Sequence, residues 1–232
     1  MNKEEIRRIK RVYEQRDIDS ESHYAWLDFS YLYTIQERDR AIAKLWKKHG
    51  FTPGADTRAL DVGGGSGKGA RWLLDLGISA KNIVVNDLMP QRLDVARSTL
   101  PSAVHFHAGD ATTLDFDAHS FDIVMQSVVF SSILDESVQS ALADNMWRMV
   151  KPNGGILWYD FVVDNPSNKN VAGVKAKRVQ QLFPKATIHS SKVTLAPPIS
   201  RRACRVLPVL YPVLNSLPWL RTHRLCWITH KR

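Results

Sequence analysis

Cysteine is scarce in this chain of 232 residues, which contains only Cys204 and Cys226. Two cysteines in so long a chain provide no disulfide framework, and we expect reduced thiols in a cytoplasmic protein. The start, Met1–Lys10, is charged throughout and lacks the apolar stretch of a secretory signal. Prolines interrupt the longest apolar run near the end, residues 203–220, so a membrane-spanning helix is not expected there. A membrane-surface or lid segment stays open.

Acidic residues are outnumbered, with 23 Asp and Glu against 32 Lys and Arg, and the net charge is +9 at pH 7. Such an excess favours an acidic partner, whether nucleic acid, anionic lipid or anionic glycan. No nucleic-acid motif accompanies the charge, so we disfavour nucleic acid. A peripheral membrane contact, at the inner face of a membrane, or an anionic glycan fits at least as well. His, Cys and Asp form no cluster with metal-ligand spacing, and we predict no obligatory metal.

Two regions differ in their hydrophobic pattern. Residues 1–57 read as a helical cap or lid, with an aromatic loop at Tyr24–Tyr33 before a second helix from about Thr34. From Arg58, strands alternate with helices, and a turn is expected at Pro152–Gly154. The expected strands are 58–62, 82–86, 103–107, 121–126, 155–161, 186–195 and 222–230. This pattern predicts an α/β domain over residues 58–232. We expect a doubly wound, mostly parallel seven-stranded sheet with helices on both faces and an N-terminal helical extension.

The strongest motif is a glycine-rich turn after the first strand, Asp61-Val62-Gly63-Gly64-Gly65-Ser66-Gly67. Glycine allows φ > 0 and lets a ligand lie directly on the backbone, beside the unpaired N–H groups of a helix start. An ATP- or GTP-binding P-loop needs glycine at 62 and Ser or Thr at 69, and both requirements fail. The dinucleotide spacing is met by Gly65, Gly67 and Ala70, so NAD(P) remains an alternative.

The placement of this turn resembles the first motif of class I methyltransferases, which bind S-adenosylmethionine (SAM). Their pattern is an acid followed by alternating glycines, here Asp61, Gly63, Gly65 and Gly67. The resemblance implies that Asp87, at the end of the second strand, accepts hydrogen bonds from the ribose hydroxyls. Taken alone, Asp87 could equally cap the following helix.

Later positions continue the resemblance. Gly109-Asp110-Ala111 looks like the family's adenine-binding segment. It implies that Asp110 accepts from the exocyclic amine, that the Ala111 N–H donates to the ring, and that Leu88 packs on the base. Residues 121–124 and 150–155 resemble two further motifs, and they imply that Gln126 lies near the methionine part of SAM.

The acceptor is expected at the carboxyl ends of the strands. The residues there are Ser127, Tyr159 and Asp160, with Asn165 in the loop above. Asp160 is the first candidate for a general base or acceptor clamp, and a structural acid that caps the next turn is an equal alternative. His223, at the start of the last strand, is a second candidate base.

A narrower resemblance covers nearly the whole chain. It is to small methyltransferases of bacterial surface-polysaccharide gene clusters, and it implies a saccharide hydroxyl as acceptor. An NAD(P) oxidoreductase and a non-catalytic SAM-fold binding subunit stay as alternatives, and the oligomeric state stays open. The segments that carry the narrower resemblance are Gln36-Glu37-Arg38, Phe130–Asp135, Trp158–Phe161, Asp164-Asn165-Pro166, Leu195–Pro198 and Leu220–His223.

Overall fold

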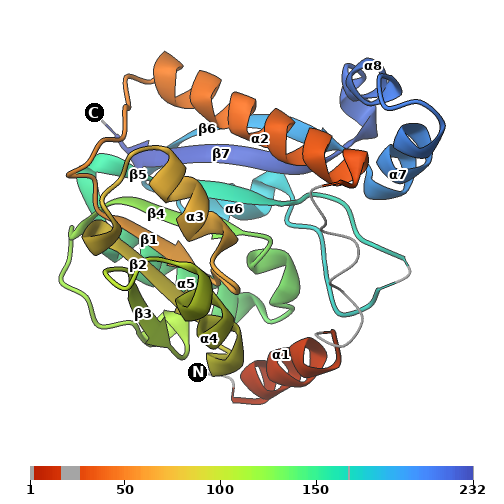
Figure 1. Cartoon of the computed structure of the whole chain (residues 1–232). Helices are drawn as coiled ribbons and strands as arrows, with labels where there is room; N and C mark the ends of the chain where they lie inside the picture. The colour runs from red at the N-terminus through yellow and green to blue at the C-terminus, as the bar shows by residue number, and fades with distance from the viewer. Residues whose placement is uncertain (1–2, 17–26, 167, 232) are drawn as a thin grey trace.

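A single seven-stranded sheet runs through the computed structural model, which describes residues 3–16, 27–166 and 168–231 (Figure 1). The strand order is β3-β2-β1-β4-β5-β7-β6, in which β7 runs antiparallel to β5 and β6 and the other pairs are parallel. This confirms the predicted doubly wound, mostly parallel sheet. The strands are β1 (Ala59–Val62), β2 (Ile83–Asp87), β3 (His105–Ala108), β4 (Phe121–Ser127), β5 (Val150–Phe161), β6 (Ala186–Leu195) and β7 (Arg221–His230).

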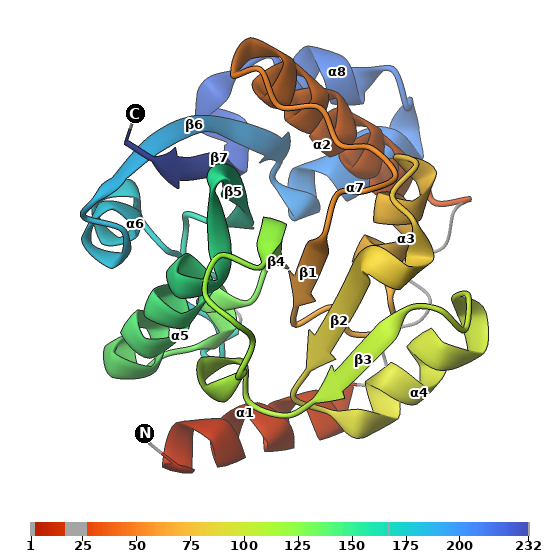
Figure 2. The same ribbon diagram turned by 90° about the vertical axis from the view of Figure 1, so that its left-hand side faces the viewer.

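Helices cover both faces of the sheet (Figure 2). One face packs against α2 (Phe29–Lys48), α3 (Lys68–Asp75) and α4 (Pro90–Thr99). The other packs against α5 (Glu136–Met149) and α6 (Ala176–Leu182), and α1 (Lys3–Arg16) joins this side. The remaining elements are α7 (Pro197–Val206), α8 (Leu210–Asn215) and the 3₁₀ turns η2 (Ala80–Asn82), η3 (Ala111–Thr113), η4 (Phe130–Ser132) and η5 (Pro218–Leu220).

The core explains why the central strands lack an alternating pattern. All four residues of β1 and all five of β2 are buried, because helices lie on both sides of these strands. Leu60 faces the α5 side and Ile83 the α3 side, and both are fully buried. Burying a side chain of this size contributes about 1.5–3 kcal/mol. The apolar strands therefore hold the sheet rigidly enough to position polar residues at its edge.

The predicted aromatic loop at Tyr24–Tyr33 is wrong for its second half. Residues Phe29–Tyr33 form the first turn of α2, and residues 24–26 lie outside the described residues. Asp28 is the cause, since its carboxylate accepts hydrogen bonds from Ser30 N at 2.7 Å and Tyr31 N at 3.4 Å. The aromatic residues at 29–33 favoured a loop in the sequence pattern, so the helix cap at Asp28 was not predicted.

The predicted turn at Pro152–Gly154 is also wrong, because these residues lie inside β5 as an irregular stretch. Phe121 of β4 lies opposite Val150, yet Ile123 lies opposite Gly155, so β5 carries extra residues here. Any Cβ on Gly154 would collide with the backbone of Asp122. A glycine is therefore needed where the two strands approach each other.

Candidate functional site

Glycine is required in the loop between β1 and α3 for both conformation and space. Gly63, Gly65 and Gly67 have φ values of +66°, +55° and +84°, a region that residues with a Cβ rarely adopt. A Cβ on Gly63 would lie 2.5 Å from Val129, and one on Gly67 would lie 2.6 Å from Leu100. The glycines therefore let the loop turn tightly over the carboxyl ends of β1 and β2 while Val129 and Leu100 pack directly against its backbone.

Asp61, the acid that opens the motif, is buried with no partner for its Oδ2 atom among the described residues. Burial, together with the neighbouring Asp87, raises the pKa of Asp61 to about 7, although Arg38 opposes the shift. The carboxylate lies against the α-carbons of Gly64 and Gly69, where no side chain would fit. Asp61 thus offers a buried oxygen that a cationic ligand group would stabilise.

Asp87 joins the glycine loop to the end of β2. Its Oδ2 accepts a hydrogen bond from Gly65 N and its Oδ1 accepts one from Met89 N, each at 2.9 Å. Arg92 approaches Oδ2 at 3.8 Å. A carboxylate oxygen has a second lone pair, so this capping role leaves Asp87 able to accept from two ribose hydroxyls as well.

Asp110 and Gln126 differ from Asp87, because each has only one of its two polar side-chain atoms hydrogen-bonded among the described residues. Asp110 caps η3 by accepting from Thr112 N at 2.9 Å, while its Oδ2 is buried and has no partner among the described residues. Gln126 accepts from Val129 N at 3.0 Å through Oε1, while its buried Nε2 has no partner in the part of the chain that the structure describes. Leu88 and Ala111 are half-buried against the same cluster of core residues.

These orphaned atoms test whether SAM fits the site. Asp61 Oδ2, Asp110 Oδ2 and Gln126 Nε2 come from the carboxyl-end region of β1, β3 and β4 in a sheet ordered 3-2-1-4. Buried polar groups are nearly always paired in proteins. Among the described residues other such atoms include those of Trp46, Asn215 and Arg224, but the three atoms of this set lie at the carboxyl edge of the sheet, where a ligand can pair with them. The two acceptors and one donor match an ammonium, an amine and a carboxylate, which SAM carries and NAD(P) does not combine. The residues present fit SAM.

Residues outside the motifs close one side of this region. Arg8 of α1 donates to the Ser132 carbonyl at 2.6 Å, and Tyr13 OH lies 3.2 Å from Ser132 Oγ. The Arg92 guanidinium lies 5.0 Å from the Tyr13 ring and would meet any Cβ on Gly65. The sequence predicted α1 as a helix, but nothing in its periodicity showed which part of the sheet it contacts.

Asp160 lies away from the other acceptor candidates. It is 0% exposed and accepts hydrogen bonds from Ser131 N at 3.2 Å and Phe161 N at 2.8 Å. Burial raises the pKa of Asp160 to about 6, although these hydrogen bonds oppose the shift. Since strand side chains alternate, Asp160 faces the η4 side and Tyr159 the α2 side. The geometry favours the structural alternative, in which Asp160 holds the η4 loop.

The remaining acceptor candidates lie around the ends of β4 and β5. Ser127 is exposed, and the Tyr159 hydroxyl lies 2.8 Å from Thr194 Oγ1. Asn165 is in the loop after β5. His223 stacks on the Tyr159 ring with 4.8 Å between centroids, and burial lowers the pKa of this histidine to about 3.

Arg38 of α2 was not predicted as a site residue. Its guanidinium lies 5.9 Å from the ring centroids of both Trp72 and Tyr159. It is also the cation that lowers the pKa of Asp61. Arg38 therefore connects the acid of the glycine motif with the aromatic residues on the acceptor side.

Gly69 gives a direct test of this packing. Glycine-to-alanine in a helix normally stabilises by about 1 kcal/mol, but at position 69 the new methyl group would collide with the Asp61 carboxylate. We expect Gly69→Ala to lower the melting temperature by roughly 2–4 °C, equivalent to about 1 kcal/mol in a chain of this size. In an Asp61→Ala background the same change should stabilise, as calorimetry of the four proteins would show. Equal effects in both backgrounds would contradict the contact.

Comparisons with known proteins agree with this geometry. Residues 59–154 match the family model described as a methyltransferase domain. The chain is 34% identical to the demethylmenaquinone methyltransferase of Renibacterium salmoninarum over 112 residues, which are 48% of this chain and 44% of that protein. It is 24% identical to the glycine/sarcosine/dimethylglycine N-methyltransferase of Actinopolyspora halophila over 173 residues, 69% of this chain and 30% of that protein. The chain thus spans less than half the length of these curated relatives.

Among solved structures, phosphoethanolamine N-methyltransferase 1 of Haemonchus contortus shares this fold. It was solved in complex with phosphoethanolamine and S-adenosylhomocysteine. The TM-score is 0.67 at 14% identity, and the alignment covers 100% of this chain and 50% of that one. At this identity the likeness concerns the fold alone.

Proposed function

We propose that this chain transfers a methyl group from SAM to a small acceptor, since residues 59–154 match the model of a methyltransferase domain. The observation that carries the proposal is the set of three buried, unpartnered polar atoms on Asp61, Asp110 and Gln126. Binding SAM would satisfy all three. The glycine loop supplies the backbone surface beside them.

In this proposal the bound donor supplies an activated methyl group on a sulfonium, and the protein holds it in place. Asp61 would hold the ammonium and Gln126 Nε2 would donate to the carboxylate of the methionine part. Asp87 would accept from the ribose hydroxyls. Asp110 and the Ala111 N–H would read the adenine edge. Leu88 would pack on the base. Most of the catalytic effect then comes from holding the two reactants in line.

The acceptor that we propose is a hydroxyl of a saccharide or glycan precursor, as the narrower resemblance implies. Ser127, Tyr159 and Asn165 supply polar groups at the ends of β4 and β5. Transfer forms an oxygen–carbon bond, breaks the carbon–sulfur bond and releases the hydroxyl proton. His223 is uncharged at neutral pH because burial lowers its pKa to about 3, so it can accept that proton only weakly. Water is the alternative proton acceptor.

Two experiments test the halves of this proposal separately. Isothermal titration should show saturable SAM binding, and saturable NADPH binding without SAM binding would overturn the donor half. Labelled SAM should then be offered with nucleotide sugars, glycans, phenols and amines. Amines belong in the panel because glycine and phosphoethanolamine appear in the relatives' names. Label transferred to amines and to no hydroxyl compound would overturn the acceptor half.

We further propose that residues 1–57 act as a cap over the donor site. The contacts of Arg8 and Tyr13 with Ser132 support this role for α1. The cytoplasm, at the inner face of a membrane, is the proposed place of action. The free, buried thiols of Cys204 and Cys226 are consistent with a reducing compartment.

Asp160 is proposed to be a positioning residue. Asp160→Asn retains one oxygen acceptor, so we expect turnover within about threefold of the wild type and an unchanged pH profile. Asp160→Ala leaves Ser131 N unpaired at a cost of about 1–3 kcal/mol and should lower the melting temperature by several degrees. Asp75→Asn, which removes an exposed carboxylate at the end of α3, is the control. A loss of turnover in Asp160→Asn beyond about a hundredfold, with the melting temperature unchanged, would instead indicate a general base.

A further inference from the structure

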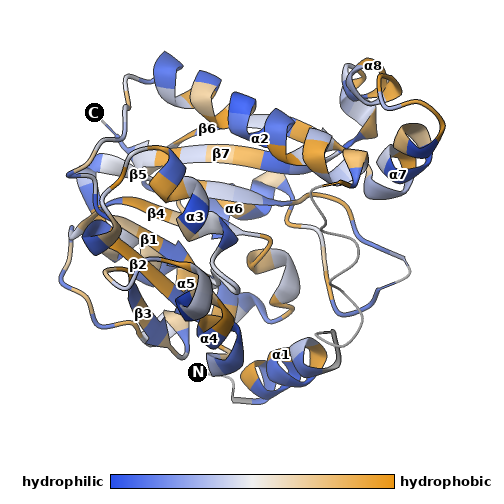
Figure 3. Cartoon of the chain, viewed as in Figure 1, coloured by the Kyte–Doolittle hydropathy of each residue, from blue (hydrophilic) through white to orange (hydrophobic). Residues whose placement is uncertain are grey.

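An exposed apolar surface extends over α7, α8 and η5, at the upper right of Figure 1. Val206 is 80% exposed and Trp219 73% exposed, and Leu207, Val209 and Val213 are each more than half exposed. Figure 3 shows the apolar residues of α7 and α8 next to hydrophilic ones at this end of the molecule. Contiguous apolar residues on a protein surface mark an interaction site more often than single ones do.

Positive charge surrounds this surface. Arg201, Arg202 and Arg205 are exposed on α7, and none has an ion-pair partner among residues 3–16, 27–166 and 168–231. Residues 165–232 contain 13 Lys and Arg and no Asp or Glu, whereas residues 1–164 contain 19 and 23, so the two parts carry +13 and −4. The part of the chain that forms the apolar surface is therefore the part that attracts anions.

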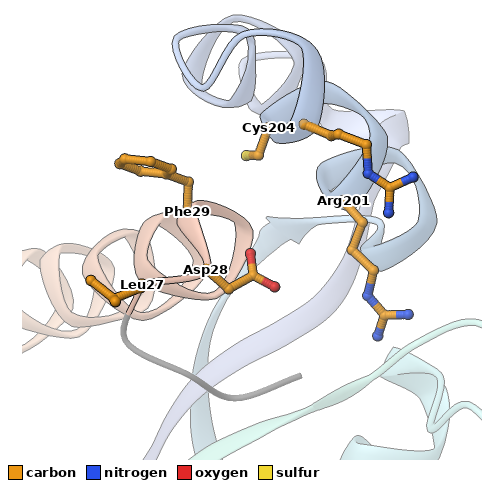
Figure 4. A pocket seen from close by; sticks show the side chains of 6 residues that line it. Leu27, Asp28, Phe29, Arg201 and Cys204 are labelled. Atoms are coloured by element: carbon orange, nitrogen blue, oxygen red, sulfur yellow. The ribbon is translucent and has the colours of Figure 1, made fainter. Parts of the chain in front are cut away.

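Two hollows flank α7. The first, about 310 Å³, lies between the start of α2 and α7, and Figure 4 shows Leu27, Asp28 and Phe29 across it from Arg201. Asp28 is the acid at this hollow, and its carboxylate already caps α2. The second, about 390 Å³, lies between α7 and α8 and has apolar walls with Arg202 beside them. Each hollow combines apolar walls with a guanidinium, as a lipid with an anionic headgroup requires.

We propose that the α7–α8 surface, meaning the exposed residues of 201–219, docks on an anionic lipid bilayer. Apolar side chains enter the interface while arginines pair with headgroups, and Trp219 suits the boundary between them. Pro208, Pro212 and Pro218 keep these helices short. Among the described residues no helix is both long and apolar enough to cross a membrane. The contact is therefore peripheral.

The docking surface lies beside the acceptor edge of the sheet. β6 ends at Leu195, opposite Arg221, and α7 follows directly, while β5 ends at Phe161, opposite His223. Both strand ends are at the carboxyl edge. Docking would thus bring the acceptor side close to the bilayer. This last consequence rests on the proposed function, whereas the docking itself does not.

Vesicle co-sedimentation tests the docking without SAM. The wild type should bind vesicles of phosphatidylcholine with phosphatidylglycerol and leave those of phosphatidylcholine alone. Replacing Arg201, Arg202 and Arg205 together by alanine should weaken binding roughly tenfold or more. The matched control replaces Lys44, Lys47 and Lys48, three exposed lysines in the last two turns of α2, and should bind as the wild type does.

The apolar contribution needs its own pair of variants. Val206→Ser with Trp219→Ser should also release the protein from anionic vesicles, whereas Val95→Ser on α4 should not, although Val95 is 52% exposed. If the arginine and lysine variants lost vesicle binding equally, net charge alone would explain the binding, and the proposal would be overturned. Binding to RNA or heparin but not to vesicles would overturn it too. Each variant's melting temperature identifies any loss caused by unfolding.

Discussion

Asp61→Asn is expected to weaken SAM binding about a hundredfold and to make the ligand-free protein more stable at pH 8. The first effect follows because the amide cannot offer a negative charge to the ligand's ammonium, and loss of one partner of a buried charge pair costs about 2–5 kcal/mol. The second follows because a buried, unpartnered carboxylate is costly to ionise. One substitution should therefore separate stability from binding.

The pH dependence has a definite sign. The pKa of Asp61 is about 7 in the folded protein, well above its usual value of 3.8. The folded state therefore binds a proton that the unfolded state releases between these values. Stability contributed by the protonated form is full below pH 4 and declines as pH rises towards 7. SAM affinity should change in the opposite direction, rising up to about tenfold per pH unit below 7 and levelling off above it.

Calorimetry between pH 5.5 and 8 measures both effects. The Asn variant should bind SAM weakly with a flat pH dependence, and its melting temperature at pH 8 should exceed that of the wild type by roughly 5 °C. Asp75→Asn removes the same charge from an exposed position at the end of α3 and serves as control. Wild-type-like SAM affinity in Asp61→Asn would remove Asp61 from the binding site.

Asp110→Asn is expected to weaken the site's preference for adenine. Oδ2 of Asp110 is the buried oxygen assigned to the exocyclic amine of adenine. In the variant an amide NH₂ can take its place, which repels that amine but pairs with the carbonyl oxygen of hypoxanthine. A site built to hydrogen-bond a ligand group strongly rejects an analogue that lacks it. We expect the preference for S-adenosylhomocysteine over S-inosylhomocysteine to shrink, with a change in the affinity ratio of about a hundredfold or more.

The control for this experiment must preserve helix capping. Asp110 also accepts from Thr112 N, and asparagine caps helices about as well as aspartate does. Asp135 caps α5 in the same way, through Ser137 N and Val138 N. Asp135→Asn should leave the ratio of the two affinities unchanged. If Asp110→Asn still prefers the adenosyl ligand as strongly as the wild type does, Asp110 does not read the base.

The sequence predicted the sheet, and it offered candidate donor-side residues, because both kinds of signal are local. A glycine run at the end of an apolar strand and an acid at or just after the end of each of the next two strands can be recognised without knowing the fold. The observed strand order brings Asp61, Asp87 and Asp110 to the carboxyl edge of the sheet. The partners of these residues could not be predicted, because Gly69, Arg92 and Arg38 meet them only through tertiary packing.

The acceptor side was harder to predict for a specific reason. Alternation along β5 requires Tyr159 and Asp160 to face opposite sides, but it does not say which side the acceptor approaches. That depends on η4, which contacts Asp160, and on α2, β6 and β7, which contact Tyr159. Tyr159 and Asp160 are neighbours in the sequence, but in the fold their side chains lie in two different environments.

The order of the last two strands has a consequence for synthesis on the ribosome. β6 emerges first, yet it pairs with β7, which enters between β5 and β6. Until residues 221–230 have left the exit tunnel, the edge of β5 is exposed and β6 has no strand to pair with. Such open edges attract other chains. Premature termination anywhere before residue 221 should therefore cost the nascent protein two strands and favour its capture by chaperones or its aggregation.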